Sequence, residues 1–221
     1  MKIIAHRGNN LDKVENNISG ILNSLNYDYI DGVEIDVRMT LDNKIVICHD
    51  LIIKTINNEF KILQKERLNN LRKETFIKSK KKYKINKLES LLKKIKTDKL
   101  IIIECKLEMG NINKFVKSIL KVLKKYKNLN ILLCSFNYDL ATKLKSRYKK
   151  VGLLIGYKIN INKNKNFDYL LVSSSYNNDL SVPYFVWTIN SINNYNKIME
   201  INKNSCFLGI ITDKSYIFKG Y

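Results

Sequence analysis

Eight short runs rich in apolar and β-branched residues recur along this 221-residue chain, and they constrain its fold more than any other feature. Several runs are almost continuously apolar, which is typical of parallel strands buried on both faces, whereas one-sided antiparallel strands alternate apolar and polar residues. The runs are Ile3–Ala5, Val33–Val37, Leu100–Cys105, Ile131–Cys134, Val151–Ile155, Tyr169–Val172, Tyr184–Trp187 and Leu208–Ile211. We therefore expect eight buried parallel strands.

Helical patterns between many of these runs indicate βα units. Apolar residues repeat at the spacing of one buried helix face over 112–123, 88–95 and 192–199. Strands that alternate with helices predict an α/β fold, and eight of them predict a closed (β/α)8 barrel of the TIM type. The connections at 157–168 and 173–183 are too short or irregular for a full helix, so we expect an incomplete outer ring of helices.

One stretch departs from this alternation. Residues 44–48 form an additional strand-like run, and the Asp-Asn pair at 42–43 predicts a hairpin turn before it. Residues 51–87 have weak periodicity and many lysines, and we interpret them as an excursion between the second and third barrel strands. This excursion either covers the active site or is a solvated loop. No repeat or linker marks a second domain, so we expect one domain over 1–221.

The charge is strongly basic, with 40 Lys and Arg against 20 Asp and Glu, a net charge of +20. Such a balance favours nucleic acid or an anionic membrane surface as a partner. However, only five of the basic residues are Arg, whose fork is the group preferred for specific recognition of phosphates and bases. We interpret the lysines as a solvated surface and expect no specific nucleic-acid partner. No apolar run approaches the ~20 residues of a membrane span, although peripheral membrane contact remains open.

The four cysteines, Cys48, Cys105, Cys134 and Cys206, lie beside apolar segments and form no CxxC pair. Such cysteines usually behave as small buried hydrophobic residues, which favours a reduced compartment inside the cell. The apolar N-terminal run is too short for a signal peptide. We therefore expect a cytoplasmic protein, and the oligomeric state stays open.

The chain has only two histidines, His6 and His49, and each follows an apolar run directly. In a parallel barrel the carboxyl ends of the strands form the active-site face. We therefore expect these two residues to be catalytic. Two imidazoles can exchange protons near neutral pH, one as a base and the other as an acid.

Three carboxylates occupy equivalent positions. Glu34 and Asp36 are two residues apart and point to one face of their strand, and Glu104 ends the third run with Lys106 on the same side. Burial of several like charges is costly unless a cation binds them, and oxygen ligands suit Mg²⁺ or Ca²⁺. The alternative is a buried ion pair between Lys106 and one carboxylate, which would leave the other carboxylates without a partner.

Together with Arg7 and Lys106, the two histidines and three carboxylates are suited to metal-assisted attack on a phosphate ester. Cations stabilise the negative charge that develops on the phosphate oxygens. The chain lacks the GxxxxGK[ST] phosphate loop, the GxSxG elbow and the GxGxxG dinucleotide motif. Chemistry that depends on a phosphate-binding loop, a nucleophile elbow or a dinucleotide-binding turn therefore fits this sequence less well.

A set of short motifs runs from one end of the chain to the other. They are His6-Arg7-Gly8, Glu15-Asn16, Glu34-Ile35-Asp36-Val37, Thr40-Leu41-Asp42, Ile47-Cys48-His49-Asp50, Ile103-Glu104-Cys105-Lys106, Ser135-Phe136, Trp187-Thr188-Ile189-Asn190 and Gly209-Ile210-Ile211-Thr212-Asp213. Each motif alone is weakly specific, but the ordered set resembles the glycerophosphodiester phosphodiesterase family.

The resemblance implies hydrolysis of glycerophosphodiesters to glycerol 3-phosphate and an alcohol, through a cyclic phosphate formed by the glycerol 2-hydroxyl. It implies one divalent cation, Mg²⁺ or Ca²⁺, and it implies roles for eight residues. These are an acid/base pair (His6, His49), three metal ligands (Glu34, Asp36, Glu104) and three phosphate- or substrate-binding residues (Arg7, Lys106, Trp187). For Trp187, a plain core aromatic is an equally good interpretation.

Departures from the family pattern fall beside Glu15-Asn16 and in the excursion. Val14 and Asn17 flank Glu15-Asn16, where the family commonly has Pro and Thr. Residues 51–55 lack the Arg, and residues 83–88 lack the Pro-Thr-Leu, that the family commonly has. These departures leave open which alcohol the enzyme would release. One alternative function is a phosphodiesterase of the lysophospholipase D type, which needs an apolar path near the mouth of the site. The other is a non-catalytic basic barrel that binds anions or nucleic acid.

Overall fold

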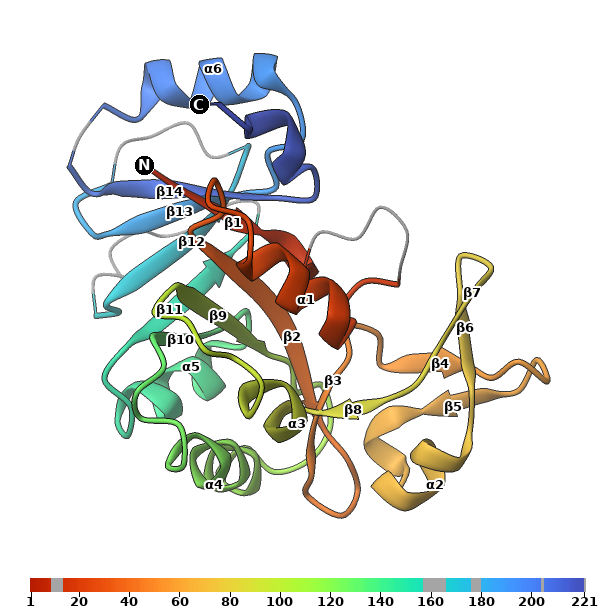
Figure 1. Cartoon of the computed structure of the whole chain (residues 1–221). Coiled ribbons are helices and arrows are strands. Elements are labelled where there is room, and N and C mark those ends of the chain that lie inside the picture. Colours follow the sequence, from red (N-terminus) through yellow and green to blue (C-terminus); the bar gives the residue numbers. More distant parts are fainter. Residues whose placement is uncertain (9–13, 157–165, 176–179, 204, 221) are drawn as a thin grey trace.

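A computed structural model describes residues 1–8, 14–156, 166–175, 180–203 and 205–220. Eight parallel strands run in the order β1-β14-β13-β12-β11-β10-β9-β2, and the pairing of β1 with β2 closes them into a barrel (Figure 1). They are β1 (Lys2–Ala5), β2 (Gly32–Met39), β9 (Leu100–Cys105), β10 (Ile131–Ser135), β11 (Val151–Ile155), β12 (Tyr169–Ser173), β13 (Tyr184–Trp187) and β14 (Phe207–Thr212). Each predicted run forms one of these strands, which confirms the TIM-type barrel.

The barrel strands are apolar on both faces because each face packs in a different core. On β9, Ile101 and Ile103 belong to the large cluster between the strands and the outer elements, whereas Ile102 belongs to a smaller cluster. The smaller cluster takes residues from alternate positions of the strands, among them Leu132, Leu171 and Phe185, as expected for a filled barrel interior. This double burial explains the continuous apolar runs.

Most of the helices that the structure describes outside the strands begin at a residue whose side chain caps the helix. In α4 (Ile112–Leu123) the Asn111 side chain accepts a hydrogen bond from the Lys114 N–H, which satisfies one of the free amides at the helix start. The other helices here are α1 (Ile18–Leu25), α3 (Leu88–Leu92), α5 (Tyr138–Lys145) and α6 (Ile192–Ile201), and two 3₁₀ turns are η1 (His6–Gly8) and η4 (Ser215–Phe218). The three helices predicted from spacing are confirmed. The expected incomplete ring depends on 157–168 and 173–183, of which residues 157–165 and 176–179 lie outside the described residues.

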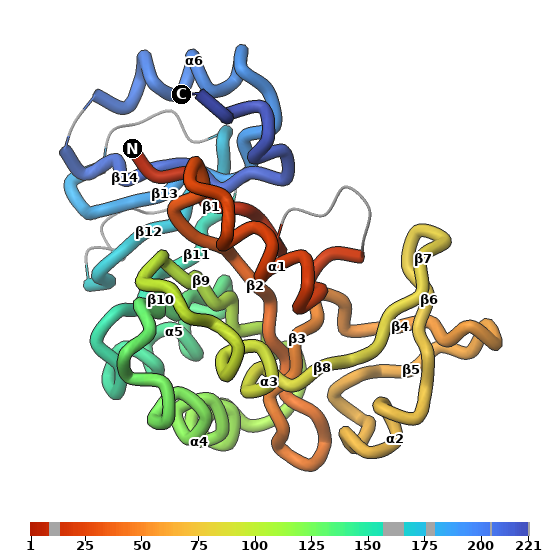
Figure 2. The backbone as a smooth tube through the Cα atoms, viewed as in Figure 1, coloured from red at the N-terminus to blue at the C-terminus, as the bar shows by residue number. Residues whose placement is uncertain are grey.

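Residues 51–87, called the inserted segment below, stand beside the barrel (Figures 1 and 2). The predicted hairpin is present, since β3 (Ile45–Ile47) pairs antiparallel with β2, and β8 (Asn86–Lys87) pairs with β3. Between them lie two further hairpins and a helix: β4 (Ile52–Lys54) with β5 (Phe60–Ile62), η2 (Leu63–Lys65), α2 (Leu68–Lys73), and β6 (Phe76–Lys78) with β7 (Lys81–Tyr83).

The inserted segment has a small apolar cluster that it shares with β3 and the residue after it. Its buried members are Val46, Cys48, Ile53, Leu63, Leu68, Leu71, Phe76 and Ile85. The segment is therefore folded, and its weak sequence periodicity reflects strands of two or three residues each.

The four cysteines are free, and three of them are buried. Within the described ranges, no helix combines the length and the apolar character that crossing a bilayer requires.

Candidate active site

The first histidine lies in a tight turn at the carboxyl end of β1. Arg7 and Gly8 both have left-handed backbone conformations, with φ of 52° and 78°. A Cβ atom at position 8 would lie 2.9 Å from the backbone of Ile21 in α1, so only glycine fits this contact. The turn of η1 thus packs against α1 with His6 and Arg7 at the rim of the barrel.

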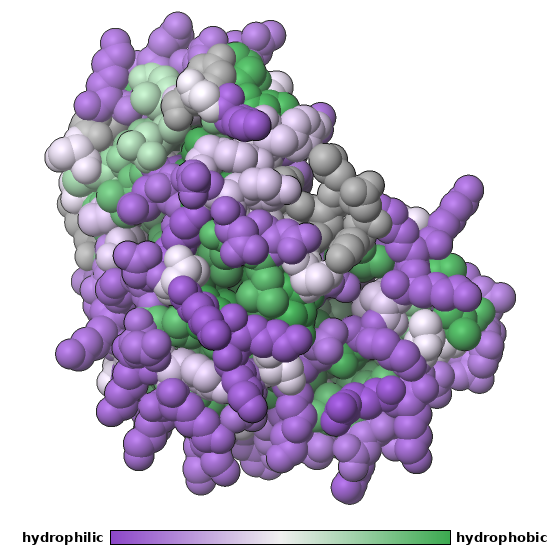
Figure 3. All heavy atoms as spheres, viewed as in Figure 1, coloured by the Kyte–Doolittle hydropathy of each residue, from purple (hydrophilic) through white to green (hydrophobic). Residues whose placement is uncertain are grey.

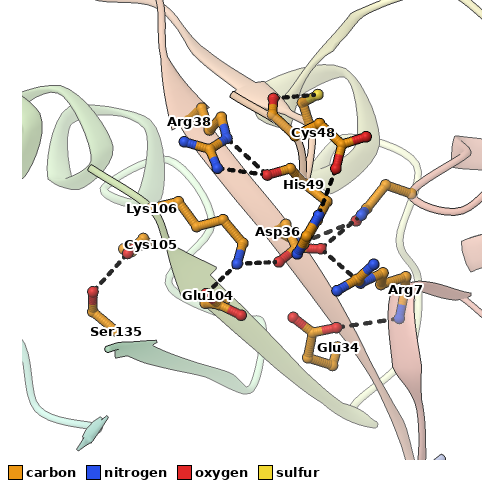
Figure 4. Close-up of polar contacts among 12 residues, drawn as sticks. Arg7, Glu34, Asp36, Arg38, Cys48, His49, Glu104, Cys105, Lys106 and Ser135 are labelled. Carbon is orange, nitrogen blue, oxygen red and sulfur yellow. Dashed lines mark hydrogen bonds and ion pairs between the residues drawn. The ribbon is translucent and has the colours of Figure 1, made fainter. Parts of the chain in front are cut away.

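Three buried carboxylates come together on two neighbouring strands. Glu34 and Asp36 lie on β2, and the strand register sets Asp36 directly beside Glu104 on β9. Each residue offers one carboxylate oxygen, and these oxygens lie within 4.8 Å of one another. In Figure 4 the three side chains converge, with Arg7 on one side of Asp36 and Lys106 on the other.

Lys106 pairs with two of the carboxylates. Its Nζ lies 2.5 Å from Glu104 Oε1 and 3.3 Å from Asp36 Oδ1. Asp36 is held further by Arg7, whose Nε lies 3.1 Å from Asp36 Oδ2, and by the Asn16 amide, which donates to the same oxygen at 2.8 Å. The ion-pair alternative therefore accounts for more of the site than the sequence suggested.

Glu34 is the exception. Its Oε2 accepts the Arg7 backbone N–H at 3.2 Å, but its buried Oε1 has no hydrogen-bond partner among the residues that the structure describes. Burial of a carboxylate oxygen without a hydrogen-bond partner costs free energy unless an ion or another polar group binds that oxygen. A divalent cation between the three carboxylates would do so, and the donor set fits one.

The charges at this centre are unbalanced without a cation. Burial, together with Asp36 and Glu104, raises the pKa of Glu34 well above its ordinary value. Burial and Asp36 raise the pKa of Glu104 to about 7 in spite of Lys106. For Asp36, Arg7 and Lys106 outweigh burial and lower the pKa. Glu34 and Glu104 thus resist ionisation as the site stands, whereas a bound cation would favour their charged forms.

His6 pairs with a carboxylate that follows β14, the strand next to β1. Its Nδ1 lies 2.5 Å from Oδ1 of Asp213, which follows β14. The Asn190 side chain donates to Asp213 Oδ2 at 2.7 Å, and the Asp213 N–H donates to Asn190 Oδ1 at 2.9 Å. The other ring nitrogen, Nε2, lies 3.7 Å from Glu34 Oε2. Asp213 therefore orients the His6 ring toward the carboxylates.

His49 has the same kind of partner but a different support. Its Nδ1 lies 2.7 Å from Asp50 Oδ1, and Lys78 Nζ lies 2.5 Å from Asp50 Oδ2. Lys78 also reaches Glu15 Oε1 at 2.7 Å. The hydrogen bond with His49 lowers the pKa of Asp50 well below its usual range despite burial, and Lys78 lowers it further. The inserted segment thus contributes a positively charged side chain, Lys78, to the surroundings of His49.

The backbone of His49 is fixed by the barrel. Arg38, a buried residue of β2, donates to the His49 carbonyl oxygen from Nε at 2.8 Å and from Nη2 at 2.6 Å. The same guanidinium pairs with Glu108. Figure 4 shows this double contact beside Cys48.

One cavity of about 220 Å³ brings together seven of the eight predicted site residues, while Asp36 is fully buried beneath it. The lining residues are His6, Arg7, Glu34, His49, Glu104, Lys106, Cys134, Phe136, Leu154, Leu171, Trp187, Thr188 and Ile211. Trp187 donates from Nε1 to the Leu171 carbonyl at 2.9 Å and packs edge-on against Phe136. Trp187 is therefore both packed in the barrel and exposed to the cavity, whose walls are charged on one side and apolar on the other.

Several residues around the histidines received no role from the sequence. Asp50, Asp213 and Asn190 lie within or beside the motifs that carry the family resemblance, so a signal was present for them. Lys78 had no such signal, because it is one of six lysines between 78 and 87.

Comparisons with known proteins give the family and the fold of this chain. Residues 6–176 match the model of the glycerophosphoryl diester phosphodiesterase family. The solved structure of the glycerophosphodiester phosphodiesterase from Thermotoga maritima is similar, with 24% identity, a TM-score of 0.75 and coverage of 98% of this chain and 96% of that chain. A phosphodiesterase from Oleispira antarctica, in complex with the product sn-glycerol-3-phosphate, has 19% identity and a TM-score of 0.78, covering 99% and 95% of the two chains.

A third structure, a glycerophosphodiester phosphodiesterase from Parabacteroides distasonis, has 20% identity and a TM-score of 0.76, covering 99% of this chain and 94% of that chain. At these identities the likeness to solved structures shows the fold. A search of the curated proteins gave no match.

Proposed function

Since the chain belongs to the glycerophosphoryl diester phosphodiesterase family and is an enzyme of that class, we propose that it cleaves glycerophosphodiesters with a divalent cation and two histidines. The reaction releases glycerol 3-phosphate and an alcohol. One observation carries the proposal: His6, His49 and the carboxylates of Glu34 and Glu104 face one cavity, and a buried oxygen of Glu34 lacks a hydrogen-bond partner among the described residues. The glycerol 3-phosphate product bound to the Oleispira antarctica phosphodiesterase supports the choice of product.

Glu34, Asp36 and Glu104 would hold the cation, for which Mg²⁺ and Ca²⁺ are both suitable. When bound, the cation would neutralise negative charge on the phosphate oxygens. Arg7 and Lys106 line the same cavity and would bind the phosphate beside it.

The two histidines would divide the proton transfers. One imidazole takes the proton of the glycerol 2-hydroxyl as that oxygen forms a bond to phosphorus. The bond from phosphorus to the leaving alcohol breaks, and the other imidazole donates a proton to the alcohol oxygen. The resulting cyclic phosphate is opened by water, with the proton transfers reversed. Attack by a neighbouring hydroxyl has the advantage of an intramolecular reaction.

The pairing of each histidine with an aspartate supports this division. Because Asp213 and Asp50 both bind Nδ1, the Nε2 atom of each ring is available to the substrate. A carboxylate in this position orients the ring and stabilises its protonated form.

The experiment is release of glycerol 3-phosphate from glycerophosphocholine with added Mg²⁺ or Ca²⁺ and with a chelator. We expect activity that requires the cation and that is lost in Glu34→Gln and Glu104→Gln. Activity indifferent to chelation would exclude the metal-dependent mechanism. No release by the cation-loaded wild type would exclude this substrate.

The apolar wall of the cavity favours one second candidate, cleavage of lysophospholipids. Leu154, Leu171 and Ile211 line the cavity beside Trp187 and Phe136 and offer contacts to an acyl-bearing substrate. Release of choline can be measured from both glycerophosphocholine and lysophosphatidylcholine. A higher kcat/KM for the lysophospholipid would favour the second candidate.

A further inference from the structure

The basic charge of the chain is concentrated in the inserted segment. Residues 51–87 contain twelve Lys and Arg and three Asp and Glu, so these 37 residues carry +9 of the net charge of +20. The remaining 184 residues carry +11. A general bias of composition toward lysine does not account for this concentration. The segment creates a local positive potential that attracts anionic surfaces.

The same segment exposes apolar side chains on one hairpin. In the β4–β5 ladder Ile52 is paired with Ile62 and Lys54 with Phe60, so these four side chains share one face. The opposite face holds Ile53, which is buried in the small cluster of the segment. The shared face is therefore the outer one.

Exposure on this hairpin is high. Phe60 is 70% exposed, the largest value for a large hydrophobic residue in the described part of the chain, and Ile52 and Ile56 are 56% and 43% exposed. The Lys54 ammonium lies 5.5 Å from the centre of the Phe60 ring. In Figure 3 hydrophobic side chains stand among hydrophilic ones on this segment, at the right of the view.

We propose that the β4–β5 hairpin, with the lysines of the neighbouring β6–β7 hairpin, is a docking surface for membranes that contain anionic lipids. Ile52, Ile56 and Phe60 would enter the boundary between headgroups and acyl chains. The lysines would lie at the level of the headgroups, where anionic lipids attract them. Exposed apolar side chains on a lysine-rich segment match the chemistry of this boundary layer.

Two other occupants fit less well. Nucleic acid is bound through stacking on aromatic side chains and through arginine forks. The outer face of the hairpin has one aromatic residue, Phe60, beside aliphatic ones, and the whole segment has only Arg67 and Arg72. A second copy of the chain would bring two segments of charge +9 together, which is unfavourable.

Docking here would bring the lipid surface near the catalytic cavity. Strand β4 begins two residues after Asp50, and Lys78 at the end of β6 contacts both Asp50 and Glu15. The proposal itself does not depend on the reaction, because binding is measured without substrate.

The test is co-sedimentation of the whole protein with vesicles of phosphatidylcholine alone and of phosphatidylcholine with phosphatidylserine. We expect binding to the anionic vesicles that weakens with added salt. The double variant Ile56→Ser/Phe60→Ser should weaken this binding about tenfold, because the insertion of apolar surface is lost. Lys80→Glu/Lys82→Glu should weaken it by at least about tenfold.

Matched controls exclude a general charge effect. Lys124→Glu/Lys127→Glu changes the net charge equally at exposed sites after α4, and Tyr27→Ser removes an exposed aromatic residue elsewhere. Both controls should bind like the wild type, and the circular dichroism spectra of all variants should agree. The proposal is overturned if the wild type does not bind anionic vesicles, or if the lysine control weakens binding as much as the Lys80/Lys82 variant. It is also overturned if Ile56→Ser/Phe60→Ser binds like the wild type, a result that would indicate a plain polyanion site.

Discussion

His6 and His49 have the same immediate partner and different supports. Each ring has an aspartate oxygen at its Nδ1 atom, 2.5 Å away for Asp213 and 2.7 Å away for Asp50. Asp213 is held by Asn190, which follows β13, so the His6 pair has its support at the ends of barrel strands. Asp50 is held by Lys78, which belongs to the inserted segment.

The two halves of the site, the His6–Asp213 pair and the His49–Asp50 pair, therefore depend on different parts of the fold. The barrel half is fixed by strands that are buried on both faces. The other half depends on a segment whose small core joins the molecule at β3. A change at Lys78 should therefore affect the His49 half more than the His6 half, to which Lys78 is linked through the Glu15–Arg7 pair.

The largest effect is expected from the histidines themselves. His6→Ala and His49→Ala should each lower kcat for glycerol 3-phosphate release about 10²–10⁴-fold, because each removes one proton transfer. The double variant should lose much less than the product of the two effects, since the residues act as a unit. If either single variant kept the activity of the wild type, the assignment of that histidine would be wrong.

The aspartates should rank next. Asp213→Asn and Asp50→Asn should each lower kcat about 10–100-fold, because the amide no longer orients the ring or stabilises its protonated form. The measurement is kcat and KM for glycerophosphocholine, with Asp139→Asn in α5 as an exposed control. A loss for only one aspartate would show that the two pairs are not equivalent.

Lys78→Met should have a smaller effect, about tenfold on kcat, because the charge-assisted hydrogen bonds to Asp50 and Glu15 are lost at a partly exposed position. Lys78→Arg should recover most of the activity, and Lys80→Met should have no effect. KM should change little in all three variants. A change in KM alone would assign Lys78 to substrate binding and not to positioning of His49.

The smallest effect concerns the carboxylates between the two histidines. Glu104 has an ordinary pKa of 4.5 and a pKa of about 7 in the folded protein, so it binds a proton more tightly when folded. This contribution to stability is complete below about pH 4.5 and is lost as the pH rises through about 7. The cation-free wild type should therefore lose a few degrees of Tm in this interval relative to Glu104→Gln.

Addition of the cation should reverse this loss in the wild type and not in Glu104→Gln, because the metal favours the ionised carboxylate. Thermal unfolding between pH 5 and 7 with and without Mg²⁺ or Ca²⁺ provides the measurement. Identical pH profiles for the two proteins would contradict the raised pKa.

Much of the barrel could be predicted because its signals are local. A strand buried on both faces is apolar at successive positions, as Leu100–Cys105 is, and a helix with one buried face repeats as 112–123 does. Helices α1 and α5 were not assigned individually. The strands of the inserted segment were missed because three residues are too few to establish a period.

The chemistry-bearing residues were predictable for a similar reason, and the contacts that distant residues make with them were not. Histidines and carboxylates directly after or within apolar runs must lie at a strand end or inside the barrel, which gave His6, His49, Glu34 and Glu104. Asp213 is 207 residues from His6, and Lys78 is 28 residues from Asp50. A contact between residues so far apart in the sequence leaves no local pattern from which it could be predicted.

The eight strands and the residue types at their carboxyl ends follow from the order of residues, because burial and strand alternation act on neighbouring positions. Closure of the barrel decided which of those residues meet, since it sets β14 beside β1 and β9 beside β2. The packing of the inserted segment decided that Lys78, among many lysines, reaches Asp50. Such contacts depend on the register of distant strands, and only the tertiary structure sets that register.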